Sequence, residues 1–134
     1  MSDYLEYSLP GDDYQVPDLV PFSVANVGTT STDVTFEGGT TVCTCPDNYV
    51  MIAQAVSFVN VTGSAIKGTL QIVSGATTVV LLEVELAANT STLIASTAAF
   101  RVIAWPTFKF QALSSAATSL DIQMLVRLIF GAGL

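Results

Sequence analysis

The chain contains no histidine, and this absence removes many kinds of enzyme chemistry. Histidine is the most frequent general base in catalysis, and it commonly activates the Ser or Cys of a nucleophile pair. Only two cysteines are present, Cys43 and Cys45, so one chain cannot supply four Cys or His ligands for zinc. We therefore expect a protein that is not an enzyme and that holds no metal or cofactor.

Charge is also scarce, because charged residues make up 11% of the chain and hydrophobic residues 51%. Soluble domains ordinarily carry about 25% charged residues. Large exposed apolar patches are rare on soluble monomers, so such a domain is expected to bury its surface against copies of itself. The alternative is a monomer whose surface is rich in Thr and Ser.

Long apolar runs are missing as well. Runs such as Val79–Leu82 are far shorter than the roughly 18 residues that a transmembrane helix needs. The first thirteen residues are acidic and lack the apolar core of a signal peptide. The net charge of −7 disfavours nucleic acid as a direct partner, because phosphate contacts need clustered Lys and Arg. We expect neither a membrane nor a nucleic acid among the partners.

No basic residue precedes Lys67, and this divides the chain in two. Residues 1–40 hold seven acids and no base, whereas residues 41–134 hold four of each. The division predicts an acidic, extended N-terminal arm over 1–40 and a neutral body over 41–134. Pro10, Pro17 and Pro21 favour extended backbone in the arm.

Ordering a 40-residue arm costs on the order of 40–80 kcal/mol of backbone entropy. A small domain has too little spare apolar surface to offset that cost, so the arm is expected to be loose or to lie across another subunit. Its aromatic and acidic residues are then candidates for contacts with an external surface. The residues selected are Tyr4, Tyr7, Asp12, Asp13, Tyr14 and Phe22.

The body alternates between apolar and polar residues with a period of two, which is typical of β-strands. Strands are predicted over 49–61, 66–73, 77–86, 91–95, 100–105, 107–112 and 119–130. They are separated by short turns, and no stretch has the period of a helix. The expected fold class is all-β: an antiparallel β-sandwich or jelly roll with an extended N-terminal arm.

A few residues could still carry chemistry, but each has a plainer explanation. Glu83 and Glu85 share one face of a predicted strand, which fits a solvated outer face better than a glycosidase pair. Asp12, Asp13 and Asp18 match no cation-binding loop. Cys43 and Cys45 are two positions apart, where a disulfide would be strained, so they are read as two small thiols on a strand. Asn60-Val61-Thr62 and Asn89-Thr90-Ser91 match the glycosylation sequon by chance.

From about Thr40 onward the order of strands and turns resembles the small β-sandwich virion proteins of tailed bacteriophages. The segments that carry the likeness are Pro46–Val50, Ile52–Val61, the hairpin Gly68–Leu86, Leu86–Leu93 and the closing strand Leu120–Phe130. The resemblance implies a homotrimeric decoration, or cement, protein on the capsid exterior, bound to the major capsid protein. In this hypothesis the arm residues named above contact the capsid.

A second hypothesis stays open beside the first. Loops at one end of the sandwich would bind a host carbohydrate receptor, as in a phage tail or head-fibre module. The candidates for glycan contact are Tyr49, Asn89 and Trp105, of which Trp105 could serve as a stacking platform.

Overall fold

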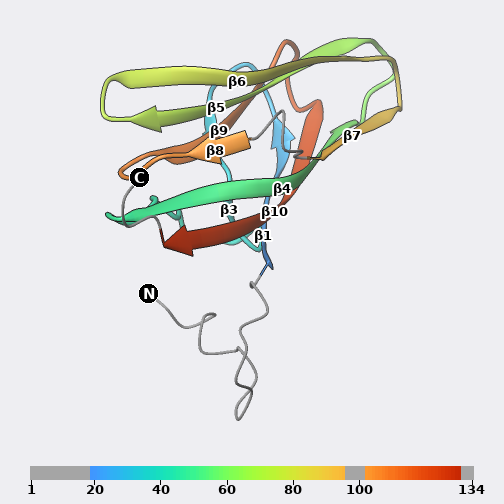
Figure 1. Ribbon diagram of the computed structural model, residues 1–134. Helices are drawn as coiled ribbons and strands as arrows, with labels where there is room; N and C mark the ends of the chain where they lie inside the picture. The colour runs from blue at the N-terminus through green and yellow to red at the C-terminus, as the bar shows by residue number, and fades with distance from the viewer. Residues whose placement is uncertain (1–18, 96–101, 131–134) are drawn as a thin grey trace.

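The computed structural model describes residues 19–95 and 102–130, and within them every regular element is a β-strand (Figure 1). Accordingly, these residues contain no helix long and apolar enough to cross a membrane. The prediction of an all-β, antiparallel fold is confirmed. The strands are β1 (Leu19–Val27), β2 (Thr32–Asp33), β3 (Thr35–Phe36), β4 (Tyr49–Asn60), β5 (Ile66–Ser74), β6 (Thr77–Leu86), β7 (Ser91–Ala95), β8 (Val102–Ala104), β9 (Lys109–Ser114) and β10 (Leu120–Phe130).

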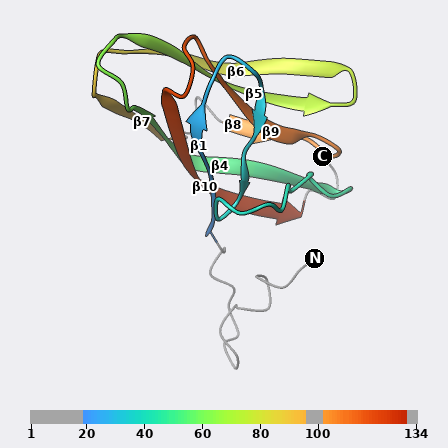
Figure 2. The same ribbon diagram turned by 180° about the vertical axis from the view of Figure 1, so that it is seen from behind.

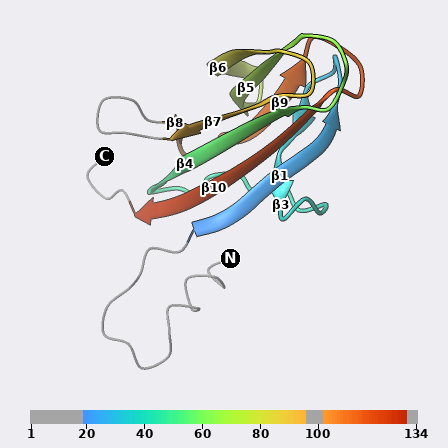
Figure 3. The same ribbon diagram turned by 90° about the vertical axis from the view of Figure 1, so that its right-hand side faces the viewer.

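The strands form two sheets that lie one above the other (Figures 1 and 2). The six-stranded sheet has the order β3-β1-β10-β4-β7, and β8 also pairs with β4. The four-stranded sheet has the order β2-β9-β5-β6. All strand pairs are antiparallel, and β1, β10 and β4 run side by side across the larger sheet (Figure 3).

The alternating residues of the sequence explain how the sheets pack. In β10, Leu120, Ile122, Met124 and Val126 are each no more than 2% exposed and point toward the other sheet. Phe58 from one sheet and Phe110 from the other are both fully buried in the core. Burying an apolar side chain of this size contributes about 1.5–3 kcal/mol, so the inner faces hold the two sheets together.

A β-bulge in β4 changes which residues reach the core. The alternation predicts that four residues share one face, namely Val50, Ile52, Val56 and Phe58. In the structure Leu125 pairs with Ala55 while Val126 pairs with Ala53, so Gln54 is an extra residue. Beyond it the faces exchange, because side chains alternate strictly along a strand. Met51 and Ala53 join the core, and Val50 and Ile52 lie on the opposite face.

The N-terminal boundary of the sandwich differs from the prediction. β1 pairs with β10 along its length, and Val20 and Phe22 are only 4% and 3% exposed. β2 and β3 also join the sheets, so residues 19–36 belong to the sandwich and not to an arm. Pro21 is tolerated because β1 pairs with only the two-residue strand β3 on its far side. Residues 1–18 of the predicted arm lie outside the described residues.

Candidate interaction surface

The outer face of the four-stranded sheet is polar around Asp33, Gln111 and Gln71, whose side chains form a hydrogen-bonded network. Asp33 Oδ1 accepts hydrogen bonds from Gln111 Nε2 at 2.8 Å and from Lys109 Nζ at 3.0 Å. Gln71 Nε2 lies 3.3 Å from Gln111 Oε1 and 3.2 Å from Ser31 Oγ. Burial alone would raise the pKa of Asp33, but the hydrogen bonds from Gln111 and Lys109 outweigh it and hold that pKa below its ordinary value.

The outer face of the six-stranded sheet is different, because small and apolar residues, interrupted by Gln123, form two rows across its strands. Pro21, Leu125, Ala55 and Ala95 are cross-strand partners in one row, from β1 to β7. The adjacent row is Ser23, Gln123, Ser57 and Leu93. We call these two rows, together with Leu19, the apolar face. Its large side chains are exposed: 69% for Leu93, 42% for Leu125 and 45% for Leu19.

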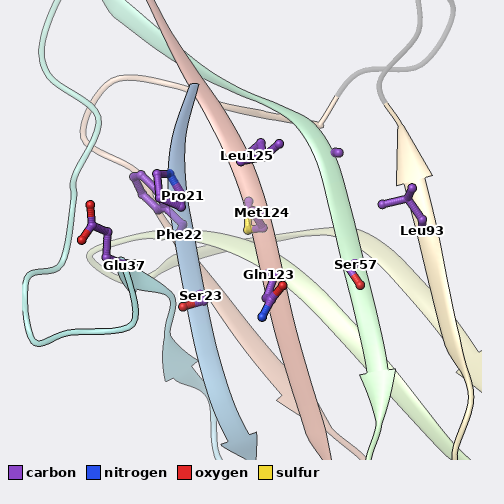
Figure 4. Close-up of a pocket in the computed structure, with 10 residues that line it drawn as sticks. Pro21, Phe22, Ser23, Glu37, Ser57, Leu93, Gln123, Met124 and Leu125 are labelled. Carbon is purple, nitrogen blue, oxygen red and sulfur yellow. The ribbon is translucent and has the colours of Figure 1, made fainter. Parts of the chain in front are cut away.

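A hollow of about 610 Å³ lies on the apolar face (Figure 4). It forms because Ala55 and Ser57 on β4 are small, while Leu93 on one side and Leu125 and Gln123 on the other are larger. Glu37, which follows β3, is the only ionisable residue among those that line it. A single carboxylate without a second acid or base does not form an acid–base pair.

Arg127 adds one unsatisfied polar group beside the apolar face. It pairs in register with Leu19 on β1 and Ile52 on β4. Its Nε atom is buried and has no hydrogen-bond partner within the described part of the chain. A buried N–H group without a partner costs about 1–3 kcal/mol.

Phe22 is not available as an external anchor, which corrects its place among the arm residues. Its ring packs edge to face on Phe36 and Phe110, with ring centroids 6.5 Å and 6.4 Å apart. The period-two pattern of β1 places this side chain in the core. The other selected arm residues lie outside the described residues: Tyr4, Tyr7, Asp12, Asp13 and Tyr14.

The three residues considered for glycan contact do not come together. Tyr49 begins β4, and Trp105 directly follows Ala104, the partner of Met51, so these two lie at one end of β4. Asn89 lies at the other end, where its backbone N–H bonds the carbonyl of Thr62 at 2.9 Å. A strand of twelve residues spans about 35–40 Å, which is far beyond the size of one sugar-binding site.

The structure also shows where the other residues considered for chemistry lie. Glu83 and Glu85 are exposed on β6, and Glu83 lies 3.9 Å from Lys67 Nζ. Cys43 and Cys45 are free thiols in an irregular segment rather than on a strand, and both pack against the core. No three Cys, Asp or Glu side chains gather to hold a metal ion within residues 19–95 and 102–130.

The sequence pattern does not single out the residues of the apolar face. Four of them belong to types that seldom act in catalysis or bind metal, and they come from strands far apart in the chain: Ala55, Leu93, Gln123 and Leu125. The available signal is the composition of the second face of each strand. That face is mixed or apolar in β4, β7 and β10, whereas a solvated sheet face is ordinarily polar.

Comparison with known proteins gives only distant likenesses. No protein-family model and no curated protein matches the chain. A pentameric capsid protein from metagenomic phage sequences is 17% identical, with a TM-score of 0.46, over 91% of this chain and 70% of its own. The virus-like particle of the extra small virus of the prawn Macrobrachium rosenbergii is 12% identical, with a TM-score of 0.41, over 89% and 84%.

An unrelated enzyme is similar at almost the same level. The α-L-arabinofuranosidase MgGH51 is 16% identical, with a TM-score of 0.40, and the match covers 91% of this chain but 21% of the enzyme. All these TM-scores lie below 0.5, so the likenesses assign no function.

Proposed function

We propose that this protein is a non-enzymatic structural subunit of a virion, and that its copies associate through the apolar face. The observation that carries the proposal is the contrast between the two outer faces of the sandwich. On the outer face of the four-stranded sheet, Asp33, Lys109 and Gln111 bond to one another. On the outer face of the six-stranded sheet, the side chains of Leu19, Leu93 and Leu125 are exposed to solvent. Exposed apolar patches of this kind mark interaction surfaces.

The charges of the chain support a second copy as the partner. Arg127 has a buried Nε atom with no acceptor among residues 19–95 and 102–130, and the chain carries eleven acids against four bases. A neighbouring copy therefore has carboxylates in excess to offer. A charge-assisted hydrogen bond at the margin of an apolar contact would set its register, while the leucine side chains supply the buried area.

The finer proposal is a decoration protein on the exterior of a phage head, bound as a homotrimer to the major capsid protein. It is supported by the resemblance of the body's sequence to small β-sandwich virion proteins and by the charge of residues 1–18. That segment holds five acids and no base, together with Tyr4, Tyr7 and Tyr14. Acids can steer the segment toward a basic surface, and tyrosines provide contact area at low entropic cost.

Charge placed on the apolar face tests self-association. Leu93→Asp and Leu125→Asp should each raise the dissociation constant of the oligomer at least tenfold. Light scattering after size exclusion, over a series of protein concentrations, measures it. The matched control is Val61→Asp, which changes a valine that is 44% exposed and lies outside the face. Circular dichroism establishes that each variant is folded. A wild-type protein that is monomeric at about 100 μM, or face variants that keep their mass, would contradict the proposal.

Removal of residues 2–18 tests the decoration role separately. This deletion spares β1, which a deletion of all 40 residues would remove. The shortened protein should keep its oligomeric mass and lose binding to capsids that lack the subunit. Unchanged capsid binding would contradict the role of the segment. Closed shells assembled from this protein alone would show a shell subunit rather than a decoration protein.

A further inference from the structure

β6 lies at the border of the four-stranded sheet, and its only strand neighbour among the described residues is β5 (Figure 1). It is ten residues long. An edge strand presents a row of backbone N–H and C=O groups that can pair with another chain. Proteins usually protect such an edge with charges, proline, bulges or a short strand.

Charge protects only the second half of β6. Glu83 and Glu85 are exposed there, and Lys67 lies across from Glu85 on β5. The first six residues, 77–82, contain no charge, no proline and no glycine. They read TTVVLL, a segment of high β propensity that suits strand-to-strand association.

The half of β6 that lacks charge also exposes a valine on each of its faces. Val79 pairs with Ile72, whose side chain is in the core, and Val80 pairs with Gln71 on the outer face. The side chains of Val79 and Val80 are nevertheless 43% and 52% exposed. A bulge at Leu81 separates these valines from the acidic half, because Leu70 pairs with Leu82 while Gln71 pairs with Val80.

We infer that β6 pairs antiparallel with β6 of a second copy, about a two-fold axis at Val79, so that two four-stranded sheets become one. In this register Val79 lies opposite its own copy, and Thr78 lies opposite Val80. The pairing is isologous, so each chain supplies the same edge. The inference goes beyond the proposed function, because it holds for this edge whatever assembly the protein joins.

The acids select this register over the alternatives. With the axis at Val79, Glu83 lies beyond the end of the partner strand and meets no carboxylate. With the axis at Val84, Glu83 would lie directly opposite Glu85 on the same face. Like charges directly opposite each other are destabilising, so the acids that protect one half of β6 direct pairing to the other half.

Disulfide cross-linking tests the register. Val79→Cys should give an intermolecular disulfide under mild oxidation, because directly opposed residues have Cβ atoms about 4.5–5.5 Å apart. The matched control is Glu83→Cys, which lies on the same strand and should cross-link at least tenfold less. Both variants retain Cys43 and Cys45, so the native thiols contribute equally. No dimer with Val79→Cys, or equal dimer with both variants, would overturn the inference.

A charge on the edge tests the pairing itself. In the Val79→Cys background, Val80→Lys should lower the disulfide yield at least tenfold, while Val61→Lys should leave it unchanged. The Leu93→Asp change on the apolar face should also leave this yield unchanged. Cross-linking that fails at β6 while the apolar face still assembles would reject the edge pairing alone. Cross-linking that disappears with Leu93→Asp would show that the edge has no pairing of its own.

Discussion

Asn60 Oδ1 accepts two hydrogen bonds from Thr62, one from the backbone N–H at 2.9 Å and one from the hydroxyl at 2.8 Å. Asn60 Nδ2 donates to the carbonyl oxygens of Ser64 at 2.7 Å and Ala87 at 3.0 Å. The side chain is 1% exposed. Asn60 and Thr62, the first and third residues of the sequon, therefore connect the end of β4 to the turn before β7 by hydrogen bonds.

Replacement of Asn60 should be costly for this reason. Asn60→Ala leaves the Thr62 N–H without its acceptor and removes the donor to the carbonyls of Ser64 and Ala87. We expect a loss of about 2–3 kcal/mol in the free energy of unfolding. Thr62→Val removes only the hydroxyl and should cost about 1 kcal/mol or less. Urea denaturation measures both. Equal losses in the two variants would show that the buried amide has no special role.

The sequence predicted the strands well because their local pattern is strong. β6 and β7 begin and end at the predicted residues, and β4 differs by one residue at its end. The bulge at Gln54 could not be predicted, because it depends on how β4 pairs with β10, 66 or more residues away in the chain. One inserted residue then moved Val50 and Ile52 to the other face.

The N-terminal boundary and the apolar face escaped prediction for related reasons. Pro21 and the nearby acids suggested an arm, but the alternation of Leu19, Val20, Pro21 and Phe22 belongs to a strand. Asp33 was assigned to that acidic arm, yet it pairs with Lys109 of the body. An acid from the N-terminal part of the sequence and a base from the C-terminal part thus come together in the folded chain. The apolar face could not be foreseen because its rows join strands whose order the sequence does not reveal.

Gly68 is required where β5 crosses the opposite sheet. A Cβ atom at this position would lie 3.1 Å from both Leu120 Cδ2 and Phe58 Cδ2. Gly68→Ala should therefore destabilise the fold by about 1–3 kcal/mol through overpacking. The control is Gly63→Ala, where an added Cβ meets no atom within 4 Å. It should be neutral or slightly stabilising in thermal denaturation. Equal effects of the two changes would contradict this view of the core.

Asp33 should make stability depend on pH in the acid range. Its folded pKa is lowered, so the native state binds fewer protons than the unfolded state around the ordinary Asp pKa of about 3.9. The contribution is present above that pH and is lost as the pH falls through the folded pKa. Asp33→Asn should cost about 1 kcal/mol at pH 7 and flatten the acid limb of the stability curve.

The control for Asp33 is Glu83→Gln, which removes the longer and more exposed contact with Lys67. Exposed pairs contribute little, so this variant should lie within about 0.5 kcal/mol of the wild type. Urea unfolding at a series of pH values compares the two. A wild-type curve and an Asp33→Asn curve that run parallel from pH 7 to pH 2 would refute the assignment.

Cys45 should resist thiol reagents in the native protein. Burial raises the pKa of its thiol to about 11, and the Sγ atom lies 3.2 Å from the carbonyl oxygen of Tyr49. At pH 8 only about 0.1% of such a thiol is thiolate, the reactive form. Cys43 is only partly buried, so iodoacetamide should label it first. Mass spectrometry of the Cys43→Ser variant isolates Cys45, and labelling as fast as in urea would contradict its burial.

Truncation should separate residues 2–18 from β1. Removing residues 2–18 leaves every described strand intact, and we expect cooperative unfolding with a midpoint close to that of the full chain.

Removing residues 2–27 deletes β1 with Val20, Phe22 and Val27, each no more than 4% exposed. At about 1.5–3 kcal/mol per buried side chain, the loss is about 5–9 kcal/mol, which is comparable to the whole stability of a small domain. The longer deletion also exposes the edge of β10, so we expect it to aggregate or remain unfolded. Circular dichroism with urea titration decides between them, and a stable, monomeric product of the longer deletion would show that β1 is dispensable.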